Sequence, residues 1–191
     1  MTTSPKCGKY LTLQNFCTCT QTYAHFPDQI APYPVQPQTL TAIADLCSHI
    51  LDPIIDNFGE ARFNLTYGFC SADLKRFLHQ KDPLTHQKRG RIDPSRDQHM
   101  SYELNRCGRL YCDRGGAACD FKILDLSSDR LVVWILDRAL PFDSLYFYGC
   151  DRPIHISYGP QHKRAIWAFT DKGTPTRQGI GYWVEKAAGI R

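Results

Sequence analysis

The most regular hydrophobic pattern in the chain lies between residues 39 and 58. Apolar side chains recur there every three or four positions, which is the spacing of one face of an α-helix. They are Leu40, Ile43, Leu46, Cys47, Ile50, Leu51, Ile54, Ile55 and Phe58. Gly59 follows as a natural end of this helix. Because Pro53 has no amide hydrogen to give to the preceding turn, we expect the helix to kink or restart there.

Shorter patterns further along the chain predict more helices and a sheet. Ser71 is a good cap for a helix that continues through Leu78. Further helices are predicted over residues 99–110 and 130–139, and strands over residues 62–69, 117–124, 144–148, 154–158 and 165–169. Helices come early and strands cluster late, which predicts an α+β fold with helices on one face of the sheet.

Prolines mark the first 38 residues, where Pro27, Pro32, Pro34 and Pro37 stand among many Thr and Gln residues. Proline at this density opposes regular helix, so residues 1–38 are predicted to form an irregular arm. The aromatic residues within it favour packing of the arm on the domain. The domain itself is expected over residues 39–170, with a Gly-rich tail over residues 171–191.

Composition limits the class of protein. A chain of 191 residues with 42% hydrophobic residues can form one domain with a core. It has no apolar run near 18 residues and no apolar N-terminal signal, and its nine cysteines are an odd number. We therefore expect free thiols in the cytoplasm and no membrane span. The net charge of +4 and a basic loop at residues 81–96 make nucleic acid a candidate partner.

The candidate chemistry centres on Asp120 and His155. Asp120 lies in an apolar strand beside small residues, where a buried carboxylate is costly unless it is paired or bound to metal. His155 lies between two isoleucines in another predicted strand. A carboxylate and an imidazole on neighbouring strands are typical of a metal site.

Several segments, taken in order, resemble the D-Ala-D-Ala carboxypeptidase/Hedgehog-type zinc peptidases over residues 39 to 160. They are Leu51-Asp52-Pro53-Ile54-Ile55-Asp56-Asn57-Phe58-Gly59, Leu65-Thr66-Tyr67-Gly68-Phe69-Cys70-Ser71, Gly116-x-Ala118-x-Asp120-Phe121, Phe142-Asp143-x-Leu145 and Ile154-His155-Ile156-Ser157-Tyr158. The resemblance implies an α+β fold with a small, mostly antiparallel sheet covered by helices. It also implies metal-dependent hydrolysis of an amide-like bond by a metal-activated water.

The resemblance further implies a set of metal ligands. In that family zinc is bound by the His and the Asp of a His-x-x-Gly-x-Ala-x-Asp stretch and by a later His. The resemblance places the Asp at Asp120 and the later His at His155. A gap-free alignment places Asp113 at the first position, and two carboxylates would suit manganese or iron(II). An insertion of residues 100–113 places His99 there instead, which gives a His/Asp/His zinc site. Both alternatives stay open at this point.

Two family positions differ in this chain. The substrate-clamping Arg corresponds to Cys70, and the catalytic acid falls near Tyr148. Candidate replacements for the acid are Asp151 and Glu103. Candidates for holding the anionic end of a small peptide-like substrate are Arg114 and Arg152. The altered positions and the basic loop also favour an alternative, a domain of the same fold that has lost catalysis and binds nucleic acid, nucleotide or a protein partner.

Overall fold

The structure is a computed structural model that describes residues 4–90, 92–169 and 175–176. Its α-helices are α1 (Leu13–Thr18), α2 (Gln21–His25), α3 (Pro37–Leu46), α4 (Asp52–Phe58), α5 (Ala72–His79) and α6 (Ser128–Asp137). Its strands are β1 (Phe63–Tyr67), β2 (Ala117–Ile123), β3 (Ser144–Phe147), β4 (Ile154–Tyr158), β5 (Ala165–Phe169) and β6 (Pro175–Thr176). The shorter helical turns are η1 (Pro27–Gln29), η2 (Cys47–Leu51) and η3 (Glu60–Arg62). The predicted α+β class is confirmed.

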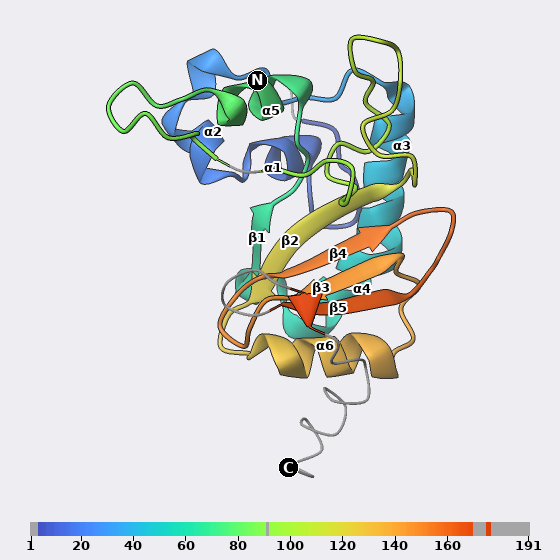
Figure 1. Ribbon diagram of the computed structural model, residues 1–191. Coiled ribbons are helices and arrows are strands. Elements are labelled where there is room, and N and C mark those ends of the chain that lie inside the picture. Colours follow the sequence, from blue (N-terminus) through green and yellow to red (C-terminus); the bar gives the residue numbers. More distant parts are fainter. Residues whose placement is uncertain (1–3, 91, 170–174, 177–191) are drawn as a thin grey trace.

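The strands form one open sheet in the order β1-β2-β4-β3-β5-β6. All neighbouring pairs are antiparallel except β3 and β5, which run parallel. The prediction of a mostly antiparallel sheet is therefore confirmed. Figure 1 shows α3 and α4 running along this sheet, while α1, α2 and α5 gather beyond one end of it. Among the described helices, none has the length and apolar character needed to cross a membrane.

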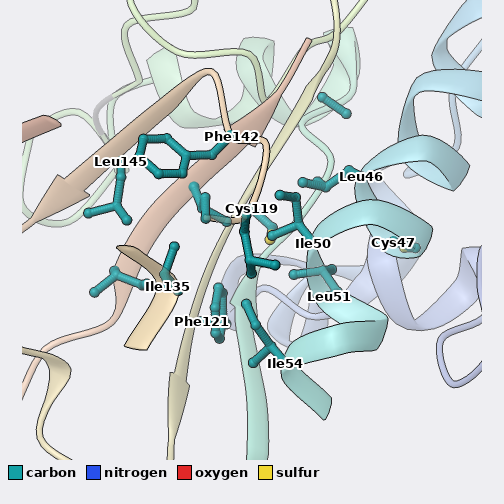
Figure 2. Packing of buried hydrophobic residues seen from close by; sticks show 14 of the residues in the cluster. Leu46, Cys47, Ile50, Leu51, Ile54, Cys119, Phe121, Ile135, Phe142 and Leu145 are labelled. Carbon is teal, nitrogen blue, oxygen red and sulfur yellow. The ribbon is translucent and has the colours of Figure 1, made fainter. Parts of the chain in front are cut away.

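Apolar residues alternate with other residues along the strands, so one face of the sheet packs against the core. Cys119 and Phe121 of β2 are fully buried and belong to the main core together with Leu145 of β3. Figure 2 shows side chains of the long helical segment, among them Leu46 and Ile50, directed at these strands. Successive strand residues point to opposite faces, so the residues between them lie on the other side of the sheet.

The long helix predicted from the 39–58 pattern is present as three consecutive segments, α3, η2 and α4. The middle segment is a π-turn, in which the amide of Asp52 donates to the carbonyl of Cys47. Pro53 follows directly, and it lacks the donor that would close an ordinary turn. A wider turn accommodates that loss, and a new α-helical segment, α4, begins at Asp52, so the restart expected at Pro53 is confirmed.

The prediction that residues 1–38 are irregular was wrong, because α1 and α2 lie within them. Thr12 caps α1 in a reciprocal arrangement with Asn15, and Thr20 caps α2. The prolines lie outside these two helices, and Pro37 begins α3. Phe16 of α1 is buried in the main core. The expected tail over residues 171–191 lies, apart from β6, outside the described residues.

The helix predicted over residues 99–110 was also wrong. Ser101 and Gly108 have positive φ angles of 48° and 71°, which a right-handed helix does not allow. Asn105 instead accepts hydrogen bonds from the amides of Cys107 and Arg109 and closes a tight turn. The loop predicted over residues 81–96 holds no helix or strand in its described part, which excludes residue 91.

Gly68 holds the N-terminal helix close to the sheet. A Cβ atom at this position would lie 2.1 Å from the carbonyl oxygen of Phe16, and the amide of Phe69 donates to that same oxygen at 3.2 Å. Only glycine permits so close an approach of two backbones.

We therefore expect Gly68→Ala to lower the free energy of unfolding by about 2–3 kcal/mol, because the added methyl group meets backbone atoms that cannot move alone. Urea denaturation measures the change. Gly90→Ala is the control, since its added Cβ would meet the flexible end of Leu78 and should cost less. Equal stability of Gly68→Ala and the native protein would contradict this contact.

Candidate metal centre

One row of side chains crosses the open face of the sheet. The strand register pairs Tyr67 with Asp120, Asp120 with His155, His155 with Tyr146, and Tyr146 with Trp167. Directly paired residues point to the same face and lie about 5 Å apart at their Cβ atoms. The row therefore runs from β1 through β2, β4 and β3 to β5, with the carboxylate and the imidazole next to each other.

A β-bulge in β1 places Tyr67 in this row. Leu65 pairs with Phe121 and Tyr67 pairs with Asp120, which leaves Thr66 as the extra residue. The Thr66 hydroxyl donates to the Asp120 carbonyl at 3.0 Å. Without the extra residue the alternation would put Thr66 opposite Asp120. The Tyr67 ring instead contacts the His99 ring edge-on, with 4.7 Å between ring centroids.

His99 reaches the row from a loop. Its carbonyl accepts a hydrogen bond from the Cys70 amide at 2.9 Å, and its Nδ1 donates to the carbonyl of Gly68 at 2.8 Å. The second bond fixes the ring orientation, since it leaves Nε2 directed at Asp120. The side chain of His99 is 6% exposed, so the loop delivers it into the interior.

Gln98 anchors the same loop to the sheet. Its Nε2 donates to the carbonyl of Gly115 at 2.6 Å and to Oδ2 of Asp143 at 3.0 Å. Asp143 is fully buried, and its other oxygen accepts a hydrogen bond from the Lys163 amide at 3.0 Å. These bonds join the segments before β2, β3 and β5 and hold the residue next to His99.

Three atoms meet at the centre of the site: Nε2 of His99, Oδ1 of Asp120 and Nδ1 of His155. The two nitrogens lie 3.3 Å and 2.9 Å from the carboxylate oxygen and 3.2 Å from each other. In a tetrahedral zinc site with bonds near 2.0–2.1 Å, neighbouring ligand atoms are about 3.3 Å apart. The three atoms thus have the spacing that one metal ion requires, and this His/Asp/His group could hold one.

The three groups also stabilise one another without metal. Burial alone would raise the pKa of Asp120, but the His99 charge and hydrogen bonds from both imidazoles hold it well below its usual range. Burial alone would lower the pKa of His99, but the Asp120 carboxylate raises it to about 9. Burial lowers the pKa of His155 and outweighs its hydrogen bond to Asp120. The metal-free centre is therefore an ion pair beside a neutral imidazole.

A cavity of about 740 Å³ opens over the centre. Its wall combines the three ligand candidates with aromatic rings and with charged residues from the basic loop. The lining residues are Tyr67, Ile92, Asp93, Ser95, Arg96, Asp97, His99, Arg114, Asp120, Tyr146, Tyr148, His155, Trp167 and Phe169. Asp120 is the ligand candidate most open to this cavity, with 28% of its side chain exposed.

The structure separates the candidates that the sequence left open. Asp113 is exposed in the turn before β2 and takes no part in the group, whereas His99 belongs to it. Asp151 and Arg152 are exposed in the turn before β4 and do not line the cavity. Arg114 does line it, and its guanidinium donates to the carbonyl of Arg96.

Glu103 is the one candidate with a clear structural task elsewhere. Its buried carboxylate accepts hydrogen bonds from the amides of Val35 and Gln36 at 3.1 Å and from the Thr39 hydroxyl at 3.0 Å. These donors surround the N-terminus of α3, where a negative charge is stabilising. Glu103 therefore caps a helix, and the prediction of a catalytic role for it was wrong.

Sequence reasoning missed Asp97, which lines the cavity and accepts a hydrogen bond from the His99 amide at 3.2 Å. Its position two residues before a candidate ligand was the available signal. The contribution of Gly68 left no signal, because it acts through its carbonyl and not through a side chain. Comparison with protein-family models, curated proteins and solved structures found no match for this chain.

For Glu103→Ala we expect a loss of about 3 kcal/mol in the free energy of unfolding, because three donors lose a charged acceptor in the interior. Glu103→Gln should lose less, since its amide oxygen still accepts. Thermal denaturation measures both, and Glu60→Ala, at an exposed position, is the control. Retention of native stability in Glu103→Ala would contradict the capping role.

The ion pair also predicts a pH dependence of the metal-free protein. The folded pKa of His99 is about 9 and its unfolded value is about 6.5. Its contribution to stability is therefore fully present below pH 6.5 and is lost as the pH rises through 9, on the order of 3 kcal/mol. Denaturation of native and His99→Gln protein across this range measures it. A constant difference between the two would contradict the ion pair.

Proposed function

We propose that the protein is a metal-dependent hydrolase of amide-like bonds, with zinc as the metal. One observation carries the proposal: His99, Asp120 and His155 direct three donor atoms at a common point on the wall of a cavity. Three protein ligands with an open side are the arrangement of catalytic zinc sites, whereas structural zinc sites use four.

The donor set fits zinc because two imidazoles and one carboxylate are ligands that it accepts. The hydrogen bond from His99 Nδ1 to the Gly68 carbonyl supports the fit, since metal-binding histidines commonly donate their other ring nitrogen in this way. When bound, zinc would polarise an amide carbonyl and lower the pKa of a water molecule. Iron(II) also accepts two imidazoles and one carboxylate, so metal analysis must distinguish the two.

Asp97 is the carboxylate that would accept a proton during hydrolysis. Among the described residues, three carboxylates line the cavity, and one of them, Asp120, belongs to the ligand group. Asp93 is paired with Arg96, with 3.2 Å between Oδ2 and Nε, and its other oxygen accepts from Ser95 at 2.7 Å. One carboxylate oxygen of Asp97 accepts a hydrogen bond from the His99 amide, and the other oxygen accepts none from the described residues. It therefore keeps a free acceptor in the cavity.

Arg114 would bind an anionic group of the substrate. Its guanidinium lines the cavity, and no carboxylate of the described residues lies within ion-pair distance of it. Arg96, the other arginine among the described residues of the wall, is already paired with Asp93. A carboxylate on the substrate would therefore find an uncompensated planar donor at Arg114.

Elemental analysis of protein purified without a His tag tests the proposal. We expect about one equivalent of zinc in the native protein and loss of the metal in His99→Ala, Asp120→Ala and His155→Ala, because two remaining ligands bind zinc weakly. His86→Ala and Asp113→Ala change exposed residues outside the group and are matched controls that should keep the metal.

Hydrolysis of N-acyl amino acids and short peptides is the second measurement. Activity that a chelator abolishes, that zinc restores and that Asp97→Asn lowers without loss of zinc would support the assigned roles. A folded native protein that neither contains nor takes up zinc or iron would overturn the proposal. The nucleic-acid alternative would then be tested by salt-dependent binding of oligonucleotides.

A further inference from the structure

Beyond His155 the row continues as a surface of aromatic rings. The Tyr146 ring stacks on the His155 ring, with centroids 4.5 Å apart and planes 14° from parallel. Phe169 contacts Tyr146 edge-on at 5.6 Å and Tyr148 at 5.1 Å. Together with Trp167 these rings line the same cavity as the candidate metal ligands.

Packing of the core does not account for Trp167. The core-facing positions of β3 and β5 are the buried Leu145, Phe147 and Ala168 and the half-buried Ile166, which packs against the same core. Trp167 points to the other face and stays 48% exposed. Its large indole surface is therefore available inside the cavity, where a flat apolar group could cover it.

The register fixes how far this surface lies from the candidate metal centre. Trp167 pairs with Tyr146, and Tyr146 pairs with His155, so two strand spacings separate Trp167 from His155. Neighbouring strands lie about 4.8 Å apart, which gives a separation of about 10 Å along the row. An extended peptide covers this distance with about three residues.

Tyr146 stands between these two points in the row. Its hydroxyl donates to the carbonyl of Arg96 at 3.0 Å, which holds the ring flat against His155. A chain that starts at the metal ligands would therefore run past the edge of the Tyr146 ring to reach Trp167, which lines the same cavity.

We propose that the substrate carries an aromatic ring about 10 Å from its scissile amide and that this ring stacks on Trp167. The inference rests on the proposed function, since the separation of about 10 Å is counted from His155, one of the proposed metal ligands. It assigns the substrate to peptide-like amides with an aromatic side chain remote from the bond that is cleaved. Trp167 is then the residue that selects for the ring.

Hydroxamates provide probes for this geometry, because their head group binds zinc and their tail can be varied. Phenylhexanohydroxamate carries its ring at the required distance, hexanohydroxamate has the same chain without a ring, and cyclohexylhexanohydroxamate has a ring that is not flat. Phenylacetohydroxamate places the flat ring too close to the metal. Titration calorimetry on the zinc-loaded native protein measures each Kd.

We expect phenylhexanohydroxamate to bind about tenfold more tightly than hexanohydroxamate, which is the usual size of an aromatic stacking contact. Cyclohexylhexanohydroxamate should gain less, and phenylacetohydroxamate should bind no better than acetohydroxamate. Trp167→Ala should remove the gain of the phenyl ring and leave the zinc content and the Kd of hexanohydroxamate unchanged. Trp167→Phe should restore part of it, and Trp167→Leu, which keeps apolar bulk, should not.

Equal Kd values for the phenyl and ring-free chains in the native protein would overturn the inference, and so would a phenyl gain that survives in Trp167→Ala. Either result leaves the metal centre intact, because acetohydroxamate still binds to the zinc-loaded protein. Failure of acetohydroxamate to bind would instead contradict the proposed function, and the inference about the ring would fall with it.

Discussion

The register between β2 and β4 is the constraint on which the rest of the structure depends. Phe121 and Ile154 pair across these strands and face the long helical segment, so Asp120 and His155 must face the other side. A slip of either strand by one residue would turn the apolar residues of that strand outward and its polar residue into the core. The free-energy cost of that exchange fixes the register, and this register pairs Asp120 with His155. Packing on one face thus creates the chemistry on the other.

Burial disfavours the charged forms of Asp120 and His99, whereas their mutual attraction favours them. This explains why the three groups occur together. A lone carboxylate or a lone imidazolium in the interior would lose its hydration without compensation. Here Asp120 compensates His99, while His155 stays neutral and still donates a hydrogen bond. A divalent cation held by the same three atoms would replace the proton on His99 Nε2, and neutral His155 would then carry its proton on Nε2 in place of Nδ1.

The sequence predicts the elements that obey a simple period and misses those that depend on local hydrogen bonds. The strands around Asp120 and His155 and the long helix before β1 follow from alternation and helical spacing. The short helices near the N-terminus were missed, because they depend on the caps Thr12 and Thr20 and the prolines of this segment lie outside them. The resemblance to zinc peptidases stays a prediction.

Within the candidate site, the two ligands on strands were predictable and the third was not. His99 belongs to a loop whose position is set by Gln98, Asp143 and the backbone of Gly68. No periodic signal marks such a residue, so His99 and Asp113 could not be separated on the sequence. Glu103 was misassigned because its partners at the start of α3 lie more than sixty positions away.

The loop origin of His99 also affects how such a site can vary among descendants of one ancestor. The pairing of Asp120 with His155 tolerates only changes that keep the hairpin geometry around β2, β3 and β4. The stretch between His99 and Asp120 lies on the surface for much of its course and closes on itself through the Asn105 turn. Residues can therefore be gained or lost there while the donor atoms stay in place. A motif defined by fixed intervals along the chain would overlook these donors, whereas a motif defined by their positions in space would recover them.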